Sequence, residues 1–305
     1  MTKEAFHRSW IFNYFGAGLI WGSSFFFIAI ANSSLAPIQL AFWRCLFGAL
    51  TLFTIIKLRK STFKINWKFF LITFALGSFN TAIPFTLFAF GEHHVSSAFA
   101  GMANAITPVA TVIALLTVFR NESVNRNQII GLLIGVVGVL TLIGVWEGIA
   151  TNSWYAVAAV ILAACCYGFG GPFIRRFIEP MGHPSEVAAF GTMSGATLFL
   201  LPIYLTQPVP TAPLTINSVV AVLVLGIFGS GIAFILYYPL LKQVGSAVSS
   251  SVTFVIPLVA ISLGVLVLGE QLKWYEPVGG FIIIIGAAVA QGIFRRDRKS
   301  TRLNS

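Results

Sequence analysis

The sequence contains very little charge for its length. Of its 305 residues only 9% are Asp, Glu, Lys or Arg, whereas 57% are hydrophobic and the mean hydropathy is +0.89. A soluble domain usually has about 25% charged residues. The composition therefore excludes an ordinary soluble protein and indicates an integral membrane protein built from apolar helices.

Cysteine is also scarce, and signatures of catalysis are missing. The three cysteines, Cys45, Cys165 and Cys166, fall inside apolar runs and match no zinc pattern. We interpret them as small buried apolar residues. The sequence contains no Walker loop, no metalloprotease helix and no nucleophile-elbow signature. We therefore expect no metal, no cofactor and no enzymatic activity.

Long apolar runs make up most of the chain. A bilayer-spanning helix needs roughly 20 mostly apolar residues, and the short connections leave no room for a separate soluble domain. The first run has no small-residue cleavage pattern, so we interpret it as a retained helix and not as a signal peptide. We predict ten spans, at about residues 10–31, 37–57, 68–90, 96–119, 127–146, 153–174, 185–206, 216–238, 246–268 and 275–294.

The basic residues behind the formal net charge of +10 follow the predicted spans. If the N-terminus is cytoplasmic and each span reverses the side, every Lys and Arg except Lys273 and Arg44 lies in an inner segment or tail. This is the positive-inside pattern. We predict a multi-pass protein of the cell inner (plasma) membrane with both termini cytoplasmic. Because the charge is explained by topology, it does not indicate nucleic acid as a partner.

The two halves of the chain resemble each other. The segment "VSSAFAGMANAITP" (95–108) aligns with "VGSAVSSSVTFVIP" (244–257), and at the same offset "LGSFNTAIPFTLFAF" (76–90) aligns with "LGIFGSGIAFILYYP" (225–239). Weaker matches follow in the same order elsewhere. The chain is therefore predicted to contain two copies of a five-helix unit, residues 1–148 and 149–305, the second of which carries the basic cytoplasmic tail.

Five is an odd number, so the second unit enters the membrane from the side opposite to the first. Inverted repeats of this kind are typical of secondary transporters, in which the two halves surround a site near the bilayer midplane. Parity alone leaves a channel and an intramembrane enzyme open as alternatives. The expected fold is an all-α integral membrane protein with ten transmembrane helices arranged as two inverted five-helix repeats.

Several short motifs occur in an order that resembles a known family. They are "WGSSF" (21–25), a proline followed by "LAFWR" (40–44), "HVSSAFAG" (94–101), "ITP" (106–108) and "VLGEQL" (267–272). Together they resemble the EamA-type branch of the drug/metabolite transporter superfamily over nearly the whole chain. The first copy departs from the family pattern, because it has "FRNE" (119–122) where a Gly-Glu pair is usual. The resemblance implies a permease that moves a small neutral or zwitterionic metabolite, such as an amino acid, by alternating access, with export favoured over import.

Two prolines interrupt equivalent apolar runs, Pro108 in the first half and Pro257 in the second. Each lacks the N–H that would bond to the carbonyl four residues earlier, and in lipid that carbonyl must find another donor or face a wet cavity. Asn104 and Thr253 occupy those earlier positions. Close helix packing through small residues and the wall of a translocation cavity both explain such faces. We take Pro108 and Pro257 as candidate hinges.

Arg44 is the only basic residue well inside a predicted span. A charge at the bilayer centre costs about 2.5 to 3.5 kcal/mol on insertion scales and indicates function. Two roles stay open for it: pairing with carbonyls or an outer-side carboxylate, and contact with an anionic group of the solute. Glu186, near the start of the seventh run, is expected to be a helix-start residue, with a coupling carboxylate as the alternative.

Polar and aromatic residues inside the runs are the candidates for a solute cavity. Trp21, Tyr167 and Tyr237 combine an apolar ring with a hydrogen-bonding group. A phosphorylated solute would need paired cations, which the spans lack. The candidate set is Trp21, Arg44, Phe79, Asn80, Phe99, Asn104, Tyr167, Tyr237 and Thr253.

The sequence "GEHH" (91–94) places a carboxylate beside two imidazoles. Such groups can bind a metal, but these are consecutive and no distant further ligand is evident. We predict a solvated outer loop, with pH sensing by histidine as the alternative. Because no Glu is expected deep in a span, a buried acidic relay is not predicted. The predicted partners are a small-molecule solute and the lipid bilayer, and a homodimer is compatible with the sequence.

Overall fold

The computed structural model describes residues 3–61, 66–119, 126–147, 154–208 and 213–290. Every regular element in these ranges is a helix, as the sequence predicted. The first half contains α1 (Lys3–Ala31), α2 (Pro37–Arg59), α3 (Trp67–Gly77), α4 (Ile83–Gly91), α5 (Ser97–Ala103), α6 (Thr107–Thr117) and α7 (Arg126–Ile143). The second half contains α8 (Trp154–Phe173), α9 (Ser185–Leu205), α10 (Ile216–Val224), α11 (Ala233–Ser250), α12 (Val255–Leu266) and α13 (Tyr275–Ala290).

Seven segments of the described chain are long and apolar enough to cross a membrane. The longest, Ile216–Leu266, has 51 residues and is broken at Gly245, where φ is 82° and ψ is 173°. This backbone conformation is essentially restricted to glycine, so the segment divides there into two arms. Two shorter apolar helices, Ile129–Ile143 and Tyr275–Gly286, accompany the seven. The segments agree with the predicted runs, while ten crossings stay a prediction.

Several long helices change their winding near the middle. A π-helical segment, η1 (Ser78–Ala82), joins α3 to α4, and another, η6 (Leu225–Ile232), joins α10 to α11. Short 3₁₀ segments, η2 (Asn104–Ile106) and η7 (Ser251–Phe254), precede α6 and α12. Such segments inside longer helices often lie at functional sites. The remaining short elements are η3 (Val145–Glu147), η4 (Ile174–Ile178) and η5 (Glu179–Met181).

Polar side chains cap three of the helices, α3, α5 and α10. Asn66, Ser96 and Thr215 each accept a hydrogen bond from the backbone N–H three residues later, at 2.7, 3.0 and 3.1 Å. These bonds satisfy N–H groups that the first helical turn leaves without an intrahelical partner. The helix starts of α3, α5 and α10 are therefore specified locally by the sequence.

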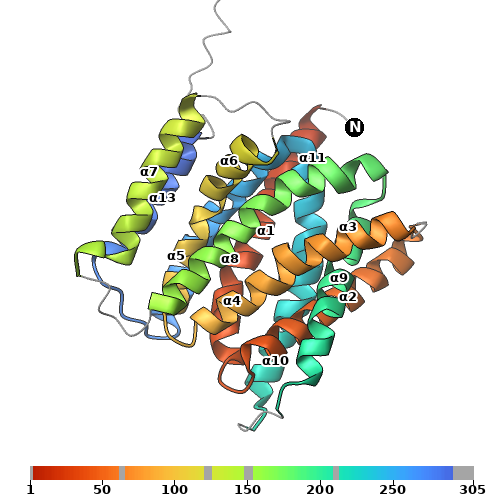
Figure 1. Ribbon diagram of the computed structural model, residues 1–305, viewed down its shortest axis with the longest axis horizontal. Coiled ribbons are helices and arrows are strands. Elements are labelled where there is room, and N and C mark those ends of the chain that lie inside the picture. The colour runs from red at the N-terminus through yellow and green to blue at the C-terminus, as the bar shows by residue number, and fades with distance from the viewer. Residues whose placement is uncertain (1–2, 62–65, 120–125, 148–153, 209–212, 291–305) are drawn as a thin grey trace, which may run out of the picture.

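The helix α7 packs along α13 at one side of the molecule, beside the main bundle (Figure 1). Glycines allow the close approach. A Cβ atom added at Gly138 would lie 2.7 Å from the backbone nitrogen of Ile283, and one added at Gly286 would lie 2.6 Å from that of Gly135. Side chains cannot approach backbone so closely, so this crossing depends on glycine at both positions.

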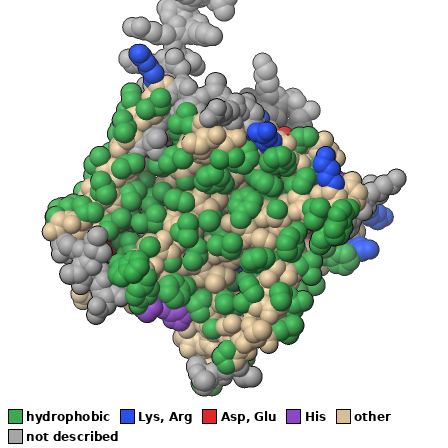
Figure 2. All heavy atoms as spheres, in the orientation of Figure 1, with side chains coloured by type: hydrophobic (Ala, Val, Ile, Leu, Met, Phe, Trp, Pro, Cys, Tyr) green, Lys and Arg blue, Asp and Glu red, His purple; other side chains and the backbone are tan. Residues whose placement is uncertain are grey.

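The rest of the chain forms a bundle in which the two halves interdigitate. The helix α1 packs against α11 and α12, α2 packs against α9, and α4 and α6 pack against α8. The surface shown in Figure 2 is largely hydrophobic, with Lys and Arg side chains toward one end and histidine at the opposite edge. A broad apolar surface of this kind suits a lipid environment.

Candidate functional site

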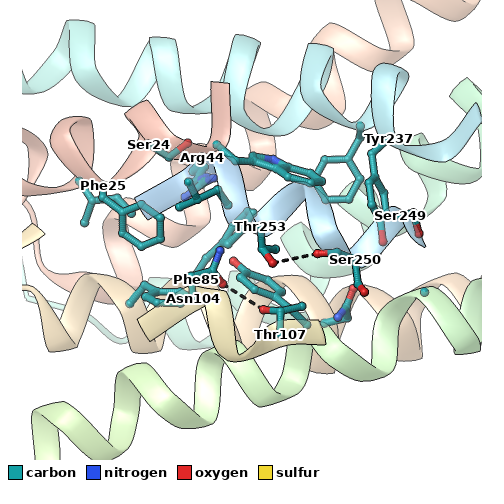
Figure 3. A pocket seen from close by; sticks show the side chains of 18 of the residues that line it. Ser24, Phe25, Arg44, Phe85, Asn104, Thr107, Tyr237, Ser249, Ser250 and Thr253 are labelled. Carbon is teal, nitrogen blue, oxygen red and sulfur yellow. Dashed lines mark hydrogen bonds between the residues drawn. The ribbon is translucent and has the colours of Figure 1, made fainter. Parts of the chain in front are cut away.

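A cavity lies inside the bundle, between helices of both halves (Figure 3). The volume in which the centre of a water-sized molecule can lie is about 80 Å³. By the same measure, one water molecule needs roughly 10 to 15 Å³. Polar groups line it together with aromatic rings. The lining residues are Trp21, Ser24, Phe25, Ile28, Arg44, Asn80, Phe85, Phe88, Asn104, Thr107, Tyr167, Gly171, Ile174, Phe234, Tyr237, Ser249, Ser250, Thr253 and Ile256.

Arg44 is the only charged residue of this lining. Its side chain extends from α2, its Nε donates to Ser230 Oγ at 3.0 Å, and its guanidinium carbon lies 3.7 Å from the ring centroid of Phe85. The residue is only 4% exposed. Among the described residues no carboxylate oxygen lies within 4 Å of its nitrogens. The cavity therefore contains a buried positive charge without a direct counterion, and a ligand carboxylate would supply one.

The π-helical segment η6 allows Trp21 and Arg44 to approach the second half closely. The indole Nε1 of Trp21 donates to the carbonyl of Gly229 at 3.0 Å, and its ring contacts that of Tyr237 with centroids 5.1 Å apart. A Cβ at Gly229 would lie 3.1 Å from Ser24 Oγ and 3.4 Å from a terminal nitrogen of Arg44. The glycine thus leaves room for the guanidinium beside the backbone.

Asn80 and Thr107 contact α8, the first helix of the second half. Asn80, in η1, donates through Nδ2 to the carbonyl of Cys166 at 2.9 Å. Asn104 accepts from Thr107 Oγ1 at 3.2 Å (Figure 3). The Thr107 hydroxyl also lies 3.3 Å from the carbonyl of Ala164. These contacts hold α8 against both interrupted helices of the first half.

The carbonyl released by Pro108 is satisfied by the chain itself. The segment preceding the proline winds as the 3₁₀ helix η2, so the backbone N–H of Thr107 bonds to the carbonyl of Asn104. In the second half, η7 precedes Pro257 in the same way, and the Thr253 hydroxyl donates to the carbonyl of Ser250 at 2.8 Å (Figure 3). The side chain of Asn104 is therefore not needed for its released carbonyl, and both Asn104 and Thr253 line the cavity.

Aromatic rings form one wall of the cavity. Phe88 stacks on Tyr167 with ring centroids 5.7 Å apart and receives the edge of Phe25 at 5.2 Å. Arg44 and Ser24 lie at one end of the cavity, while Tyr237 and Ser249 lie at the other (Figure 3). A solute would therefore meet a cation at one end and hydroxyl groups at the other, with apolar rings between them.

The structure places most of the predicted site residues around this cavity. Trp21, Arg44, Asn80, Asn104, Tyr167, Tyr237 and Thr253 line it, whereas Phe79 and Phe99 do not. Phe79 packs edge-on against Phe173, with centroids 5.2 Å apart, and Phe99 belongs to the apolar core. The hinge candidates Pro108 and Pro257 are buried in α6 and α12, outside the lining.

Sequence reasoning missed several lining residues. Ser24, Phe25 and Ile28 follow Trp21 on α1 at helical steps of three, four and seven, so they share its face. Phe85 and Phe88 have the same spacing on α4. The signal was thus available in the periodicity around Trp21, but aromatic residues of a membrane protein more often face lipid.

The predicted solvated loop at "GEHH" is wrong for its glutamate. His93 and His94 are exposed, but both carboxylate oxygens of Glu92 are buried and have no hydrogen-bond partner. Burial raises the pKa of Glu92 well above its ordinary value; the charge of Glu270 raises it further and that of Arg44 lowers it. For His93, burial and then the neighbouring His94 lower the pKa. This burial could not be predicted from the sequence, and the charged residues that act on Glu92, Glu270 and Arg44, are distant from it in the chain.

Two other glutamates have structural partners. Glu270 accepts from the backbone N–H groups of Ser97 and Ala98 at 2.8 and 3.0 Å, at the start of α5. Glu186 is the second residue of α9, as expected of a helix-start residue. It pairs with Arg59 at 3.5 Å and accepts from Ser61 at 2.5 Å, outside the cavity lining.

The described part of the chain contains no group of three or more His, Cys, Asp or Glu side chains arranged to hold a metal ion. Its three cysteines are free thiols, and Cys45 is buried. The predicted small, buried role is thus confirmed for Cys45, while Cys165 and Cys166 are half-buried.

Comparisons with known proteins agree over the full length of the chain. The model of the EamA-like transporter family matches residues 8–144 and 154–291. Protein PagO of Salmonella typhimurium is 28% identical over 88% of each chain. Protein PecM of Dickeya dadantii is 25% identical over 93% of this chain and 94% of that protein. An uncharacterized inner membrane transporter of Escherichia coli, YedA, is 25% identical over 90% and 88%.

One solved crystal structure has the same fold. It superposes with a TM-score of 0.67 at 20% sequence identity, over 94% of this chain and 99% of the other. At this identity the likeness concerns the arrangement of helices and not the chemistry of the cavity.

Proposed function

The chain belongs to the EamA-like transporter family, and we propose that it is a secondary transporter that moves a small metabolite across the cytoplasmic membrane by alternating access. Relatives named as transporters, one of them an inner membrane transporter, support this class. Apolar membrane-spanning segments and a broad apolar surface are consistent with a multi-pass membrane protein.

We propose ten crossings arranged as two inverted five-helix repeats. The two matches of the family model support a repeat. The π-helical segments η1 and η6 lie at equivalent positions in the sequence alignment of the halves, and η2 and η7 precede the paired prolines. Both halves therefore share the same irregularities, which independent helices would not be expected to share.

Both termini are proposed to be cytoplasmic. Exposed basic side chains such as Lys57, Lys60 and Arg176 belong to segments that the charge pattern assigns to the inner side. The exposed His93 and His94 belong to an outer segment by the same pattern.

One observation carries the proposal: a cavity between the two halves contains the buried guanidinium of Arg44, which has no carboxylate counterion among the described residues. A buried cation without a counterion is costly, and a bound carboxylate would offset that cost with charge-assisted hydrogen bonds. No second cation lines the cavity, so a phosphorylated solute is a poor match. The aromatic wall and the hydroxyl groups suit a neutral or zwitterionic metabolite, such as an amino acid. Export, which the family resemblance favours, stays a prediction.

Alternating access would use the interrupted helices. The segments η2 and η7 replace regular helical bonding with 3₁₀ turns beside the cavity, directly before Pro108 and Pro257. Such points allow helix arms to tilt without breaking long runs of hydrogen bonds. Tilting of the two halves would expose Arg44 to one side of the membrane and then to the other.

A transport screen tests this function. Purified protein in liposomes is offered a mixture of labelled amino acids and related carboxylates, alongside the variants Arg44→Gln and Arg176→Gln. We expect uptake above empty liposomes for the wild type and for Arg176→Gln, whose side chain is at the surface. The variant Arg44→Gln should show no uptake above that of empty liposomes. Absence of any carboxylate transport by folded wild-type protein, or full activity of Arg44→Gln, would contradict the proposal.

A further inference from the structure

Buried polar atoms without partners gather at one end of the bundle. The described residues contain five such side-chain atoms, and four of them belong to Asn32, Glu92 and Ser97. Asn32 follows α1, Glu92 follows α4, and Ser97 begins α5. Asn32 Nδ2 also donates to the carbonyl of Ala89 at 2.8 Å, which joins the ends of α1 and α4. Native structures leave few buried polar atoms unpaired, so each requires an explanation.

Glu92 lies one helical turn after Phe88, a residue of the cavity wall. Its backbone N–H bonds to the carbonyl of Phe88 at 2.9 Å, so Glu92 continues the helical turn that carries this ring. Phe88 lines the cavity, whereas Glu92 does not. The carboxyl group therefore lies outside the cavity lining, and its two oxygens are buried from solvent.

Two charged groups from other elements act on the Glu92 carboxyl. Arg44, from α2, is the cavity cation, and Glu270 belongs to the segment between α12 and α13. Glu270 is held by two backbone N–H groups, so its negative charge is fixed in place. The helix α1 contributes the neutral Asn32, and His93 and His94 on the same turn are exposed. Beyond these, α8 contributes Tyr155, whose ring packs against His94.

We propose that Glu92 is the proton-binding group of this transporter, and that a proton on Glu92 and a solute carboxylate at Arg44 favour each other. The inference rests on the proposed function for the solute, but the proton site stands on its own geometry. The carboxylate accepts one proton from hydronium and releases one water; no other reactant is needed. Ca²⁺ or Mg²⁺ would need about six oxygen ligands, and the described residues contain no group of three or more His, Cys, Asp or Glu side chains that could hold a metal ion.

The sign of the coupling follows from charge. An ionised Glu92 partly neutralises Arg44 through space, and a bound solute carboxylate would take over that role. The added negative charge near Glu92 then favours its protonated form. Because coupling between two sites is reciprocal, protonation of Glu92 strengthens solute binding to the same degree. Proton and solute would move in the same direction, so an inward proton gradient would drive uptake, opposite to the export that the resemblance favours.

The first measurement concerns the proton alone. Infrared spectra of the purified protein in lipid are recorded against pH for the wild type, Glu92→Gln and the control Glu179→Gln. Glu179 is partly exposed and pairs with Arg175 outside the cavity lining. We expect the wild type to show a protonated-carboxyl band that persists at pH values above the pKa range of ordinary glutamates. This band should be absent from Glu92→Gln and present in Glu179→Gln. A band that Glu92→Gln retains, or the absence of any such band, overturns the proton site even if transport is found.

The second measurement concerns coupling and uses the amino-acid mixture in liposomes. With an acidic outside, wild-type protein should accumulate label, and Glu92→Gln should lose accumulation but keep exchange of labelled for unlabelled solute. Above the pKa of Glu92, the apparent solute Kd of the wild type should rise by up to about tenfold per pH unit, and that of Glu92→Gln should not. Gradient-driven uptake by Glu92→Gln, tighter binding at higher pH, or dependence on Na⁺ in place of H⁺ overturns the inference. If the wild type shows neither uptake nor exchange, the proposed function fails while the infrared result stands.

Discussion

The chemistry of the cavity depends on a few side chains, and Arg44 is central among them. Lysine at this position would keep the charge but lose the planar fork and the Nε bond to Ser230. Hydrogen bonds to charged groups contribute about 1.5 to 3 kcal/mol, which corresponds to roughly 10- to 100-fold in affinity. We therefore expect Arg44→Lys to raise the half-saturating solute concentration in exchange assays by about that factor.

Ser230→Ala is the matched control for Arg44→Lys. It removes only one hydroxyl acceptor from Nε and leaves the terminal guanidinium nitrogens unchanged. Arg44→Lys loses this hydrogen bond and the planar fork together, so the loss of solute affinity should be smaller for Ser230→Ala than for Arg44→Lys. Equal solute affinity in Arg44→Lys and the wild type would argue that Arg44 only fills space beside Phe85.

The buried Glu92 carboxyl should make stability depend on pH. The pKa of Glu92 is raised in the folded protein above the ordinary value of 4.5. Below pH 4.5 the carboxyl group is protonated in both the folded and the unfolded protein, so its burial costs no stability through ionisation. As pH rises above that value the unfolded state ionises while the folded state resists, and stability falls until the folded pKa is passed. Glu92→Gln removes this loss, about 1.4 kcal/mol for each pH unit between the two pKa values. Melting temperatures should therefore favour Glu92→Gln at neutral pH and converge with the wild type near pH 4; a constant difference at all pH values would contradict the buried carboxyl.

Sequence reasoning recovered the polar lining residues better than the apolar ones. Arg44, Asn80 and Asn104 are conspicuous because polar groups inside apolar runs are costly and rare. Glu92 was missed because its position beside two histidines is typical of a loop, and the charges that act on its carboxyl group, Arg44 and Glu270, are distant in sequence. Phe79, also a candidate, packs its ring on Phe173 and does not line the cavity.

The helices around the cavity combine predictable and unpredictable features. Paired prolines predicted interruptions at Pro108 and Pro257, and the structure shows 3₁₀ turns before both. The π-helical segments η1 and η6 were not predicted, because their residues also suit an ordinary helix. Within η6, the carbonyl of Gly229 accepts a hydrogen bond from Trp21, which is distant in sequence.

Replacement of Pro108 tests the hinge. Pro108 lies in the first turn of α6, and alanine there would regain an N–H that could bond to the carbonyl of Asn104. Pro108→Ala should therefore straighten the junction of η2 and α6 and slow the tilting. An added barrier of about 1.4 kcal/mol would lower the rate about tenfold. The maximum rate of exchange measures this. The control is Pro202→Ala, which removes a proline from inside α9, outside the cavity lining; equal rates for both variants and the wild type would remove the hinge from the mechanism.

The crossing of α7 and α13 depends on glycine. A Cβ at Gly279 would contact the backbone nitrogen of Leu142, which cannot move aside, whereas one at Gly280 would meet the flexible side chain of Met102 at 3.2 Å. Overpacking typically costs about 1 to 3 kcal/mol. Gly279→Ala should therefore lower the melting temperature of the detergent-solubilised protein more than Gly280→Ala does. The reverse order would mean that α7 and α13 pack differently.

The proposed organisation of the whole molecule rests on the distribution of charge and on the predicted repeat. The sequence predicted helices at all the observed apolar segments, because hydrophobic length is a direct consequence of bilayer thickness. How the two halves interlock around one cavity could not be predicted, because it depends on packing between helices that are far apart in sequence.

Orientation in the membrane can be measured with single cysteines. Cys45, Cys165 and Cys166 are replaced by alanine, and a cysteine is introduced at Lys60 or Lys273, both exposed. A membrane-impermeant maleimide should label position 273 in intact cells and position 60 only after permeabilisation. Labelling of both positions from the same side would contradict the odd number of crossings that separates them in the proposed topology.

The central claim is that one cavity with a buried cation opens alternately to the two sides of the membrane. Counterflow tests it most directly: liposomes loaded with unlabelled solute are diluted into a trace of labelled solute. Alternating access predicts a transient accumulation of label that requires solute on the opposite side and is lost in Arg44→Gln. Entry of label at the same rate with and without internal solute would indicate a simple pore and would contradict the account.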